Sequence, residues 1–295
     1  MIRNKSISEK MFDGINSIIM ILLMLLCLYP LLYVAFASVS EGTQLISHSG
    51  LLIRPLGINF SSYKMVFENP MILQGYGNTL FIVIVGLIVN LLMTSLGAYF
   101  LSRKGMYWKK SITMFIVFTM FFGGGLIPFY LTIKGLNLND TLWAVIIPYA
   151  INTYNLIIMR TSFEAIPESL EEAAKMDGAN DFHVLFKIVL PLSMPVIAVM
   201  ILYYGVAHWN SWFPAMMFIR KRELYPLQLI LREILIENNT DAMMTNAGVN
   251  IEDYLTATLT VKYATTMIAT IPILCVYPFL QKYFAKGVMI GAVKG

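Results

Sequence analysis

Six long apolar stretches run through this chain and limit the structures that it can form. Within a few residues they cover 15–39, 78–101, 111–133, 141–160, 189–212 and 263–284. Each approaches or exceeds the roughly 20 residues with which a helix crosses the apolar core of a bilayer. Because lipid offers no hydrogen bonds, a spanning segment must satisfy its own backbone groups, and a helix does so. The sequence therefore predicts an all-α membrane protein with six transmembrane helices.

Composition agrees with this prediction. Hydrophobic residues make up 58% of the chain and charged residues 13%, whereas soluble domains are about half apolar and a quarter charged. The net charge of +4 is accounted for by lysines and arginines of the predicted cytoplasmic loops, and it gives no support to nucleic acid binding. Cys27 and Cys275 lie inside apolar spans, so we expect them to act as small hydrophobes and to form no disulfide framework.

The first span, 15–39, raises the alternative of a cleaved signal peptide. It follows a short basic start, and Ala35-Phe36-Ala37 near its end resembles a signal-peptidase site. The apolar run is longer than the about 7 to 15 residues of a signal peptide. We therefore expect a retained transmembrane helix.

The short loops predict the orientation in the membrane. The N-terminal tail 1–14 carries three lysines and arginines and the 102–110 loop carries four, whereas the 40–77 loop has two and the 134–140 loop has one. Lysine and arginine are enriched in cytoplasmic loops. Both termini are therefore predicted to face the cytoplasm of a multi-pass plasma membrane protein.

This topology divides the chain into a membrane domain, 15–285, between cytoplasmic tails at 1–14 and 286–295. The domain includes a cytoplasmic region at 161–190 and an extracellular loop at 213–262. That loop departs from the charge rule because it contains several cations: Arg220, Lys221, Arg222, Arg232 and Lys262. Long loops count less in the rule.

Several functions are disfavoured by what the chain lacks. No Asp, Glu, Lys or Arg lies within the six spans away from their ends, although ion-coupled carriers and pumps usually need such groups. The sequence contains no phosphate-binding glycine loop of the Walker type, no His-Glu-x-x-His motif and no Gly-x-Ser-x-Gly motif. His48, His183 and His208 lie in different segments. An enzyme and a self-powered pump are therefore both poor interpretations.

Helix-breaking residues interrupt the spans. They are Pro30, Gly123-Gly124-Gly125 with Pro128, Pro148, Pro191, Pro195, Pro272 and Pro278. Breaks inside a membrane persist where protein or a water-filled cavity satisfies the freed backbone groups. Ordinary helix packing explains any single break, but together they favour a bundle with an internal passage.

Two polar and aromatic clusters are candidates for solute contact. Tyr204, Trp209 and Asn210 belong to the aromatic segment 203–213, and aromatic faces with amides suit a polyhydroxylated solute. An interfacial aromatic belt is the alternative, and it is favoured for Trp212 and Phe213. Asn152, Tyr154 and Asn155 lie within the fourth span, where amides either join helices or face a solute. The sequence leaves both questions open.

The cytoplasmic region 161–190 is predicted to form two helices joined by a tight turn. Pro167 in the first turn, with acids behind it, favours a helix start. Gly178 suits a left-handed C-cap and Asn180 can cap a second helix. Glu172 is available for a basic residue of a partner. An amphipathic connector between two spans is the alternative.

The same region contains a spaced signature. It consists, in order, of Glu172-Ala173-Ala174, a gap of three residues, Gly178, a gap of nine residues, and Ile188-Val189-Leu190-Pro191. This pattern resembles the EAA signature of the membrane-spanning subunits of type I ABC importers at every fixed position. Asp177 beside Gly178, and Trp209-Asn210, resemble the carbohydrate branch, similar to the smaller permease subunit of maltose-type transporters.

The likeness runs from about residue 15 to Gly295. Segments 122–128 and 226–235 further resemble a subgroup linked to complex oligosaccharide uptake in Gram-positive bacteria. The resemblance implies the six-helix permease fold with a cytoplasmic coupling helix. It also implies a set of coupling residues, namely Glu172, Ala173, Ala174, Asp177, Gly178, Leu190 and Pro191.

The family's division of labour gives further expectations. ATP and Mg²⁺ would be bound by a separate dimeric ATPase, and this chain would hold no cofactor or metal of its own. The stretch from Pro167 to Gly178 would fit a groove of that ATPase, with Glu172 paired to a basic residue. A second homologous permease would complete the pore, and an extracellular lipoprotein would deliver the carbohydrate. In maltose-type importers the larger permease can hold the sugar alone, which leaves this chain's solute contacts open.

Alternative functions remain for the same bundle. The chain would be an autonomous channel or facilitator if it conducts without ATP, or an importer permease for a non-sugar solute. An intramembrane enzyme is disfavoured because nucleophiles, bases and metal ligands do not cluster. In the 213–262 loop, Leu227, Ile230, Leu231, Ile234 and Leu235 recur at helical spacing and predict an amphipathic helix on the outer surface, followed by a polar, mobile tail at 237–250.

Overall fold

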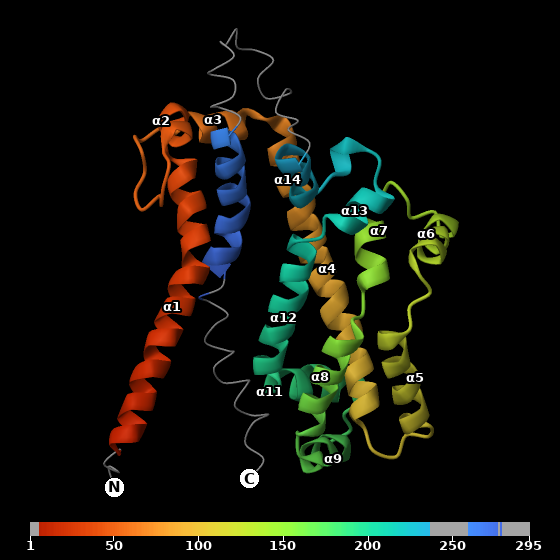
Figure 1. Cartoon of the computed structure of the whole chain (residues 1–295). Coiled ribbons are helices and arrows are strands. Elements are labelled where there is room, and N and C mark those ends of the chain that lie inside the picture. Colours follow the sequence, from red (N-terminus) through yellow and green to blue (C-terminus); the bar gives the residue numbers. More distant parts are fainter. Residues whose placement is uncertain (1–5, 237–258, 277, 279–295) are drawn as a thin grey trace. The chain divides into compact units, whose positions relative to one another are not determined.

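The computed structural model describes residues 6–236, 259–276 and 278, and every regular element in this part of the chain is a helix. The chain divides into two compact units (Figure 1). Unit 1 comprises Met1–Asn69 with Ile234–Thr270, and unit 2 comprises Pro70–Glu233 with Ile271–Gly295.

Unit 1 is built on one long helix, α1 (Ile7–Ser38), followed by the short helices α2 (Gly42–Ser47) and α3 (Ser61–Glu68). Its hydrogen bonds connect distant segments of the sequence. The hydroxyl groups of Ser38 and Tyr63 lie 2.8 Å apart, and Ser62 Oγ donates to Thr260 Oγ1 at 2.8 Å. These bonds join α1, α3 and the helix Leu259–Val276, so the first and last predicted spans contribute to the same unit.

Unit 2 starts with the longest helix, α4 (Pro70–Ser102). The remaining helices are α5 (Lys109–Phe121), α6 (Leu126–Gly135), α7 (Trp143–Ile146), η1 (Ile147–Tyr149), α8 (Thr153–Glu164), α9 (Glu168–Met176), α10 (Asp181–Val184), η2 (Leu185–Val189), α11 (Leu190–Leu192), α12 (Met194–Trp209), α13 (Phe213–Phe218), η3 (Arg222–Leu224) and α14 (Leu227–Ile236). The helix α14 continues into unit 1 at Ile234. The α4 helix packs against α8 and α12, and Ala98, Leu156 and Met200 are buried in the resulting core.

Most of the predicted spans correspond to helices in the described residues. Three continuous helices are long and apolar enough to cross a membrane: Ile7–Ser38, Pro70–Ser102 and Leu259–Val276. Two further candidates are bent pairs. The α5 and α6 helices meet at 112°, and the segment Asp181–Leu192 meets α12 at 86°. The fourth predicted span, 141–160, is broken between η1 and α8.

The predicted helix breakers behave differently from one another. Pro30 lies inside α1 without interrupting it. The glycines 123–125 do separate α5 from α6, and Gly125 has φ +86°, which favours glycine. Pro191 follows η2, which is a π-helix. A proline ring collides with the carbonyl group four residues earlier, and a wider turn relieves that contact.

The helical prediction in the 213–262 loop is confirmed by α14, where Leu227, Ile230, Leu231 and Ile234 are buried and Leu235 is exposed. The apolar stripe of this helix is thus covered by protein. The predicted polar tail at 237–250 lies outside the described residues, as do the last residues of the 263–284 span.

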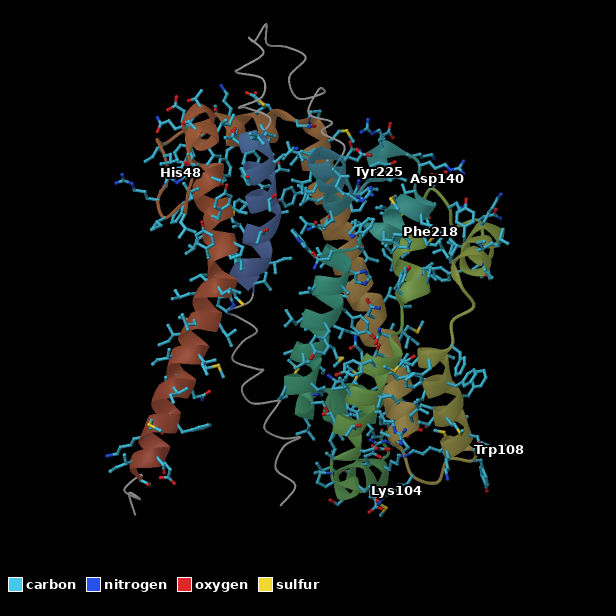
Figure 2. The ribbon with its side chains drawn as sticks, viewed as in Figure 1. His48, Lys104, Trp108, Asp140, Phe218 and Tyr225 are labelled. Carbon is cyan, nitrogen blue, oxygen red and sulfur yellow. The ribbon has the colours of Figure 1, made fainter. Side chains whose placement is uncertain are left out.

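The ends of unit 2 carry different elements. Figure 1 shows α9 at one end and α13 with α14 at the other. In Figure 2, Lys104 and Trp108 lie at the α9 end, whereas Asp140, Phe218 and Tyr225 lie at the opposite end. We call these the α9 end and the α13 end.

Candidate functional site: the coupling helix and the central cavity

The coupling helix predicted from the signature is α9. It begins at Glu168, directly after Pro167, which takes an extended conformation as the N-cap. Glu168 and Glu171 lie in the first turn, where the helix dipole favours acids. The predicted start is therefore confirmed, with Pro167 one position before the helix and not within it.

The helix ends in the turn that the sequence predicts. Gly178 has φ +86°, its N–H donates to the Lys175 carbonyl at 3.0 Å, and the Ala179 N–H donates to the Ala174 carbonyl at 2.9 Å. This pair of bonds is a Schellman motif, in which the left-handed position suits glycine. Asn180 then caps the next helix, because its Oδ1 accepts from the His183 N–H at 2.8 Å.

One face of α9 is fastened to the end of α4. Glu171 forms an ion pair with Arg103, and the two side chains are only 10% and 19% exposed. The Arg103 guanidinium also lies 4.7 Å from the centre of the Tyr99 ring. Burial lowers the pKa of Arg103, and nearby acids and Tyr99 oppose this effect. At the surface, Lys104 Nζ donates to Glu168 Oε2 at 2.8 Å. The sequence analysis did not predict that Arg103 and Glu171 attach α9 to the end of α4.

The opposite face of α9 is exposed. Glu172, Ala173 and Asp177 all lie on the surface of unit 2, and Met176 beside them is 88% exposed. Ala174 packs partly against the core shared by α4, α8 and α12. The signature residues therefore serve two surfaces: Glu172 and Ala173 face outward, whereas Ala174 seats the helix. Leu190 and Pro191 lie next to the 86° bend that leads into α12.

A second charged cluster lies between α5 and α8. Glu164 Oε1 accepts from Lys109 Nζ at 2.9 Å and from Arg160 Nε at 3.0 Å. Burial raises the pKa of Glu164, but these bonds and the two positive charges outweigh it, so the pKa lies below the ordinary value. The end of α8 is thus tied to the start of α5.

A cavity of about 720 Å³ lies between the two ends of unit 2. Its walls carry tyrosines, amides and apolar groups, from Val145, Tyr149, Ile151, Asn152, Tyr154, Asn155, Leu202, Tyr203, Tyr204, Val206, Ala207, His208, Ser211 and Pro214. Four predicted solute contacts, Asn152, Tyr154, Asn155 and Tyr204, are therefore brought together. Trp209 and Asn210 are not among the lining residues. Trp209 is buried with its ring edge-on to Tyr76, and Asn210 is the exposed C-cap of α12.

Several of these lining residues have structural partners. The Tyr204 hydroxyl lies 2.8 Å from Thr94 Oγ1 and accepts from the Asn152 N–H at 3.1 Å. Asn152 Oδ1 accepts from the Asn155 N–H at 3.1 Å and caps α8. Tyr154, in contrast, is 53% exposed. Tyr154 therefore lines the cavity with an exposed side chain and remains a predicted solute contact.

The broken helix beside the cavity is held by a residue that the sequence analysis did not select. Asn90 of α4 is fully buried, and its Nδ2 donates to the carbonyls of Tyr149 at 2.6 Å and Ala150 at 3.0 Å. Its Oδ1 lies 2.6 Å from His208 Nε2. A side chain at Gly86 would collide with the His208 ring, since a Cβ there would lie 2.6 Å from Nε2. The available signal was an amide in the middle of an apolar span.

The family of the chain follows from comparison with known proteins. Residues 106–290 match the model of the family described as "Binding-protein-dependent transport system inner membrane component". The chain belongs to this family. The match includes α9 and the complete signature. The chain is thus a permease component, and α9 is the element that the family resemblance identifies as the coupling helix.

Individual relatives cover nearly the whole permease. A polygalacturonan/rhamnogalacturonan transport system permease protein, YtcP of Bacillus subtilis, is 38% identical over 97% of this chain and 99% of its own. Protein LplC of the same organism is 40% identical over 97% and 96%. The crystal structure of a bacterial ABC transporter involved in the import of the acidic polysaccharide alginate contains a chain that is 34% identical. It has a TM-score of 0.86 and covers 95% of this chain and 99% of its own. The predicted permease fold is confirmed by this likeness.

Proposed function

We propose that this chain is the permease subunit of an ATP-driven importer that carries an oligosaccharide across the plasma membrane by alternating access. One observation carries the proposal: α9 is fastened by Glu171 and Glu168 on one face and presents Glu172 and Ala173 on the other. A helix held in this way can pass on the movement of a docked partner. The ATPase dimer would supply that movement by binding ATP with Mg²⁺ and closing.

The carbohydrate class is supported by two independent facts. The relatives carry names of polygalacturonan, rhamnogalacturonan and alginate transport. The cavity combines tyrosine rings with amide and imidazole groups, which is suitable chemistry for a polyhydroxylated ligand. A non-sugar solute gains no support from either fact.

The other partners follow from the family. A second, homologous permease would complete the passage, and an extracellular solute-binding lipoprotein would deliver the sugar, as the family description indicates for a binding protein. Lipid would surround the exposed apolar side chains of the spans. Both termini would lie in the cytoplasm, as the loop charges predict, and the bacilli among the relatives favour a Gram-positive cell.

The test is a charge reversal at the exposed acid of α9. Glu172→Lys should leave membrane insertion intact, abolish copurification of the ATPase and abolish uptake, because the substitution puts a positive charge where a partner's basic residue would bind. The matched control is Glu68→Lys, at an exposed glutamate of unit 1. This substitution should change neither the copurification of the ATPase nor the uptake. Normal uptake by Glu172→Lys would contradict the coupling assignment.

The channel alternative has its own experiment. The purified chain alone, reconstituted in liposomes without an ATPase, should admit no labelled oligosaccharide. Uptake under those conditions would favour an autonomous facilitator over an importer subunit.

A further inference from the structure

The α13 end of unit 2 carries a cationic group that the coupling function does not use. Between residues 211 and 236 the chain has four cations, Arg220, Lys221, Arg222 and Arg232, against two acids, Glu223 and Glu233. These cations lie in the loop that departs from the positive-inside rule. Long loops count less in this rule, so the surroundings of each cation decide what it can do.

Arg232 is distinguished from its neighbours by its surroundings. Its guanidinium lies 4.9 Å from the centre of the Trp212 ring, and the side chain is partly buried. The adjacent acid is already engaged, because Glu233 Oε2 accepts from Arg222 at 2.7 Å. Within residues 6–236 and 259–276, no carboxylate pairs with Arg232. A partly buried guanidinium without a carboxylate is a favourable place for an anion.

The position of Trp212 connects this charge with the cavity. Ser211, immediately before it, and Pro214, two residues after it, both line the cavity wall. The cavity lining itself contains no Lys, Arg, Asp or Glu. A cation close to the cavity, with neutral walls beyond it, would attract an anion without trapping it deep inside, which a translocation pathway needs.

We propose that Arg232, stacked on Trp212 beside the cavity, is an entry site for the carboxylate groups of an acidic oligosaccharide. The inference rests on the proposed function and specifies its substrate as a chain of uronic acid residues. The guanidinium fork matches a carboxylate in two parallel hydrogen bonds, while the indole offers an apolar face to the sugar ring. Lys221 and Arg220, which are exposed, would add longer-range attraction.

The experiment compares charged and neutral versions of one sugar in cells that contain the complete importer. Uptake of trigalacturonate and of its fully methyl-esterified form is measured for the wild type, for Arg232→Gln and for Lys134→Gln. The last variant removes one exposed cation from α6 and is the control. Arg232→Gln should raise the KM for trigalacturonate by roughly tenfold, as loss of a charge-assisted bidentate contact predicts. The KM for the ester should not change.

Salt provides a second measurement that does not depend on uptake of the ester. The KM of the wild type for trigalacturonate should rise with ionic strength, because screening weakens attraction between exposed charges. This rise should be smaller for Arg232→Gln and unchanged for Lys134→Gln.

Three results would overturn the inference. If Arg232→Gln raises the KM equally for trigalacturonate and for its methyl ester, Arg232 has a structural role or a role in docking of the binding protein. Unchanged kinetics for Arg232→Gln would remove the site altogether. An importer that depends on this chain and carries a neutral oligosaccharide but no trigalacturonate would refute the acidic substrate and leave the proposed function standing. If deletion of the chain affects no carbohydrate uptake, the proposed function itself fails.

Discussion

Glu168, Glu171 and Glu172 lie within one and a half turns of α9, but their side chains have different surroundings. Glu171 pairs with Arg103 below the helix, and Glu168 pairs with Lys104 at its edge. Glu172 is exposed on the far side. The 3.6-residue period of a helix separates neighbouring positions by about 100°, which explains why Glu171 is buried against Arg103 while the adjacent Glu172 is exposed.

The first prediction concerns the ion pair between Glu171 and Arg103, which attaches α9 to the end of α4. Glu171→Gln should destabilise the protein by about 3 kcal/mol, because it leaves the partly buried Arg103 guanidinium without its counter-charge. Glu168→Gln, which removes a more exposed pair, should cost less than about 1 kcal/mol. Thermal unfolding of the purified variants measures both. Equal effects would show that the Arg103–Glu171 pair is no more important than a surface contact.

The second prediction concerns acid. The pKa of Glu164 is lowered in the folded protein by its bonds to Lys109 and Arg160. Its contribution to stability is therefore complete above the ordinary pKa of 4.5 and is lost as the pH falls through the lower, folded value. The melting temperature of the wild type should fall more steeply below about pH 4.5 than that of Glu164→Gln. If the melting temperatures of the two proteins fall in parallel with pH, Glu164 does not contribute this pH-dependent stability.

Among the helical elements, the break between η1 and α8 depends on a side chain that is distant in sequence. The residues 150–152 are not helical, and the carbonyls of Tyr149 and Ala150 are satisfied by Asn90 of α4. In a membrane, a broken helix persists only when such groups find partners. Asn90 therefore stabilises one wall of the cavity.

The third prediction tests this clamp. Asn90→Ala should cost about 2 to 4 kcal/mol, since two partly buried carbonyl groups lose the donor of a fully buried amide, and it should lower uptake. Asn78 is a matched control, because its Nδ2 also donates to two carbonyls, those of Glu223 at 2.8 Å and Tyr225 at 3.1 Å, in a more exposed place. Asn78→Ala should cost less. If the two variants unfold alike, burial of the Asn90 clamp is not what matters.

The local features of the site could be predicted from the sequence. Gly178 and Asn180 act through neighbours in the chain, so their turn and cap follow from residue type and spacing. The contacts of Arg103 and Asn90 join residues 68 and about 60 positions apart, and one sequence contains no signal for such pairs. The sequence analysis named Pro148 as a helix breaker in the 141–160 span, but the donor that satisfies the freed carbonyl groups lies on another helix and could not be predicted. Asn152 turned out to cap α8, which explains its polarity without a solute.

For the molecule as a whole, the orientation in the membrane remains a prediction from loop charges, and it decides which end of unit 2 meets the ATPase. Tyr107 beside the α9 end is 88% exposed, and Lys221 at the α13 end is also exposed. The free cysteines Cys27 and Cys275 can be replaced by serine to give a cysteine-free protein for labelling.

The fourth prediction uses these positions. In intact cells, a membrane-impermeant maleimide should label Lys221→Cys and leave Tyr107→Cys unlabelled. Both variants should be labelled after the membrane is permeabilised. The reverse pattern would place the termini outside and α9 away from any cytoplasmic ATPase.

Helix α4 has 33 residues, so it is about 50 Å long. At one end the chain continues directly into Arg103, which holds α9, and at the other end Asn78 and Thr79 hold the backbone of residues 223–227. This one helix therefore connects the α9 end of unit 2 with the α13 end. In the proposed function, a displacement of α9 would therefore be transmitted along one continuous helix to the α13 end, with no relay through intermediate side chains, and the stiffness of that helix would set how closely the two ends move together.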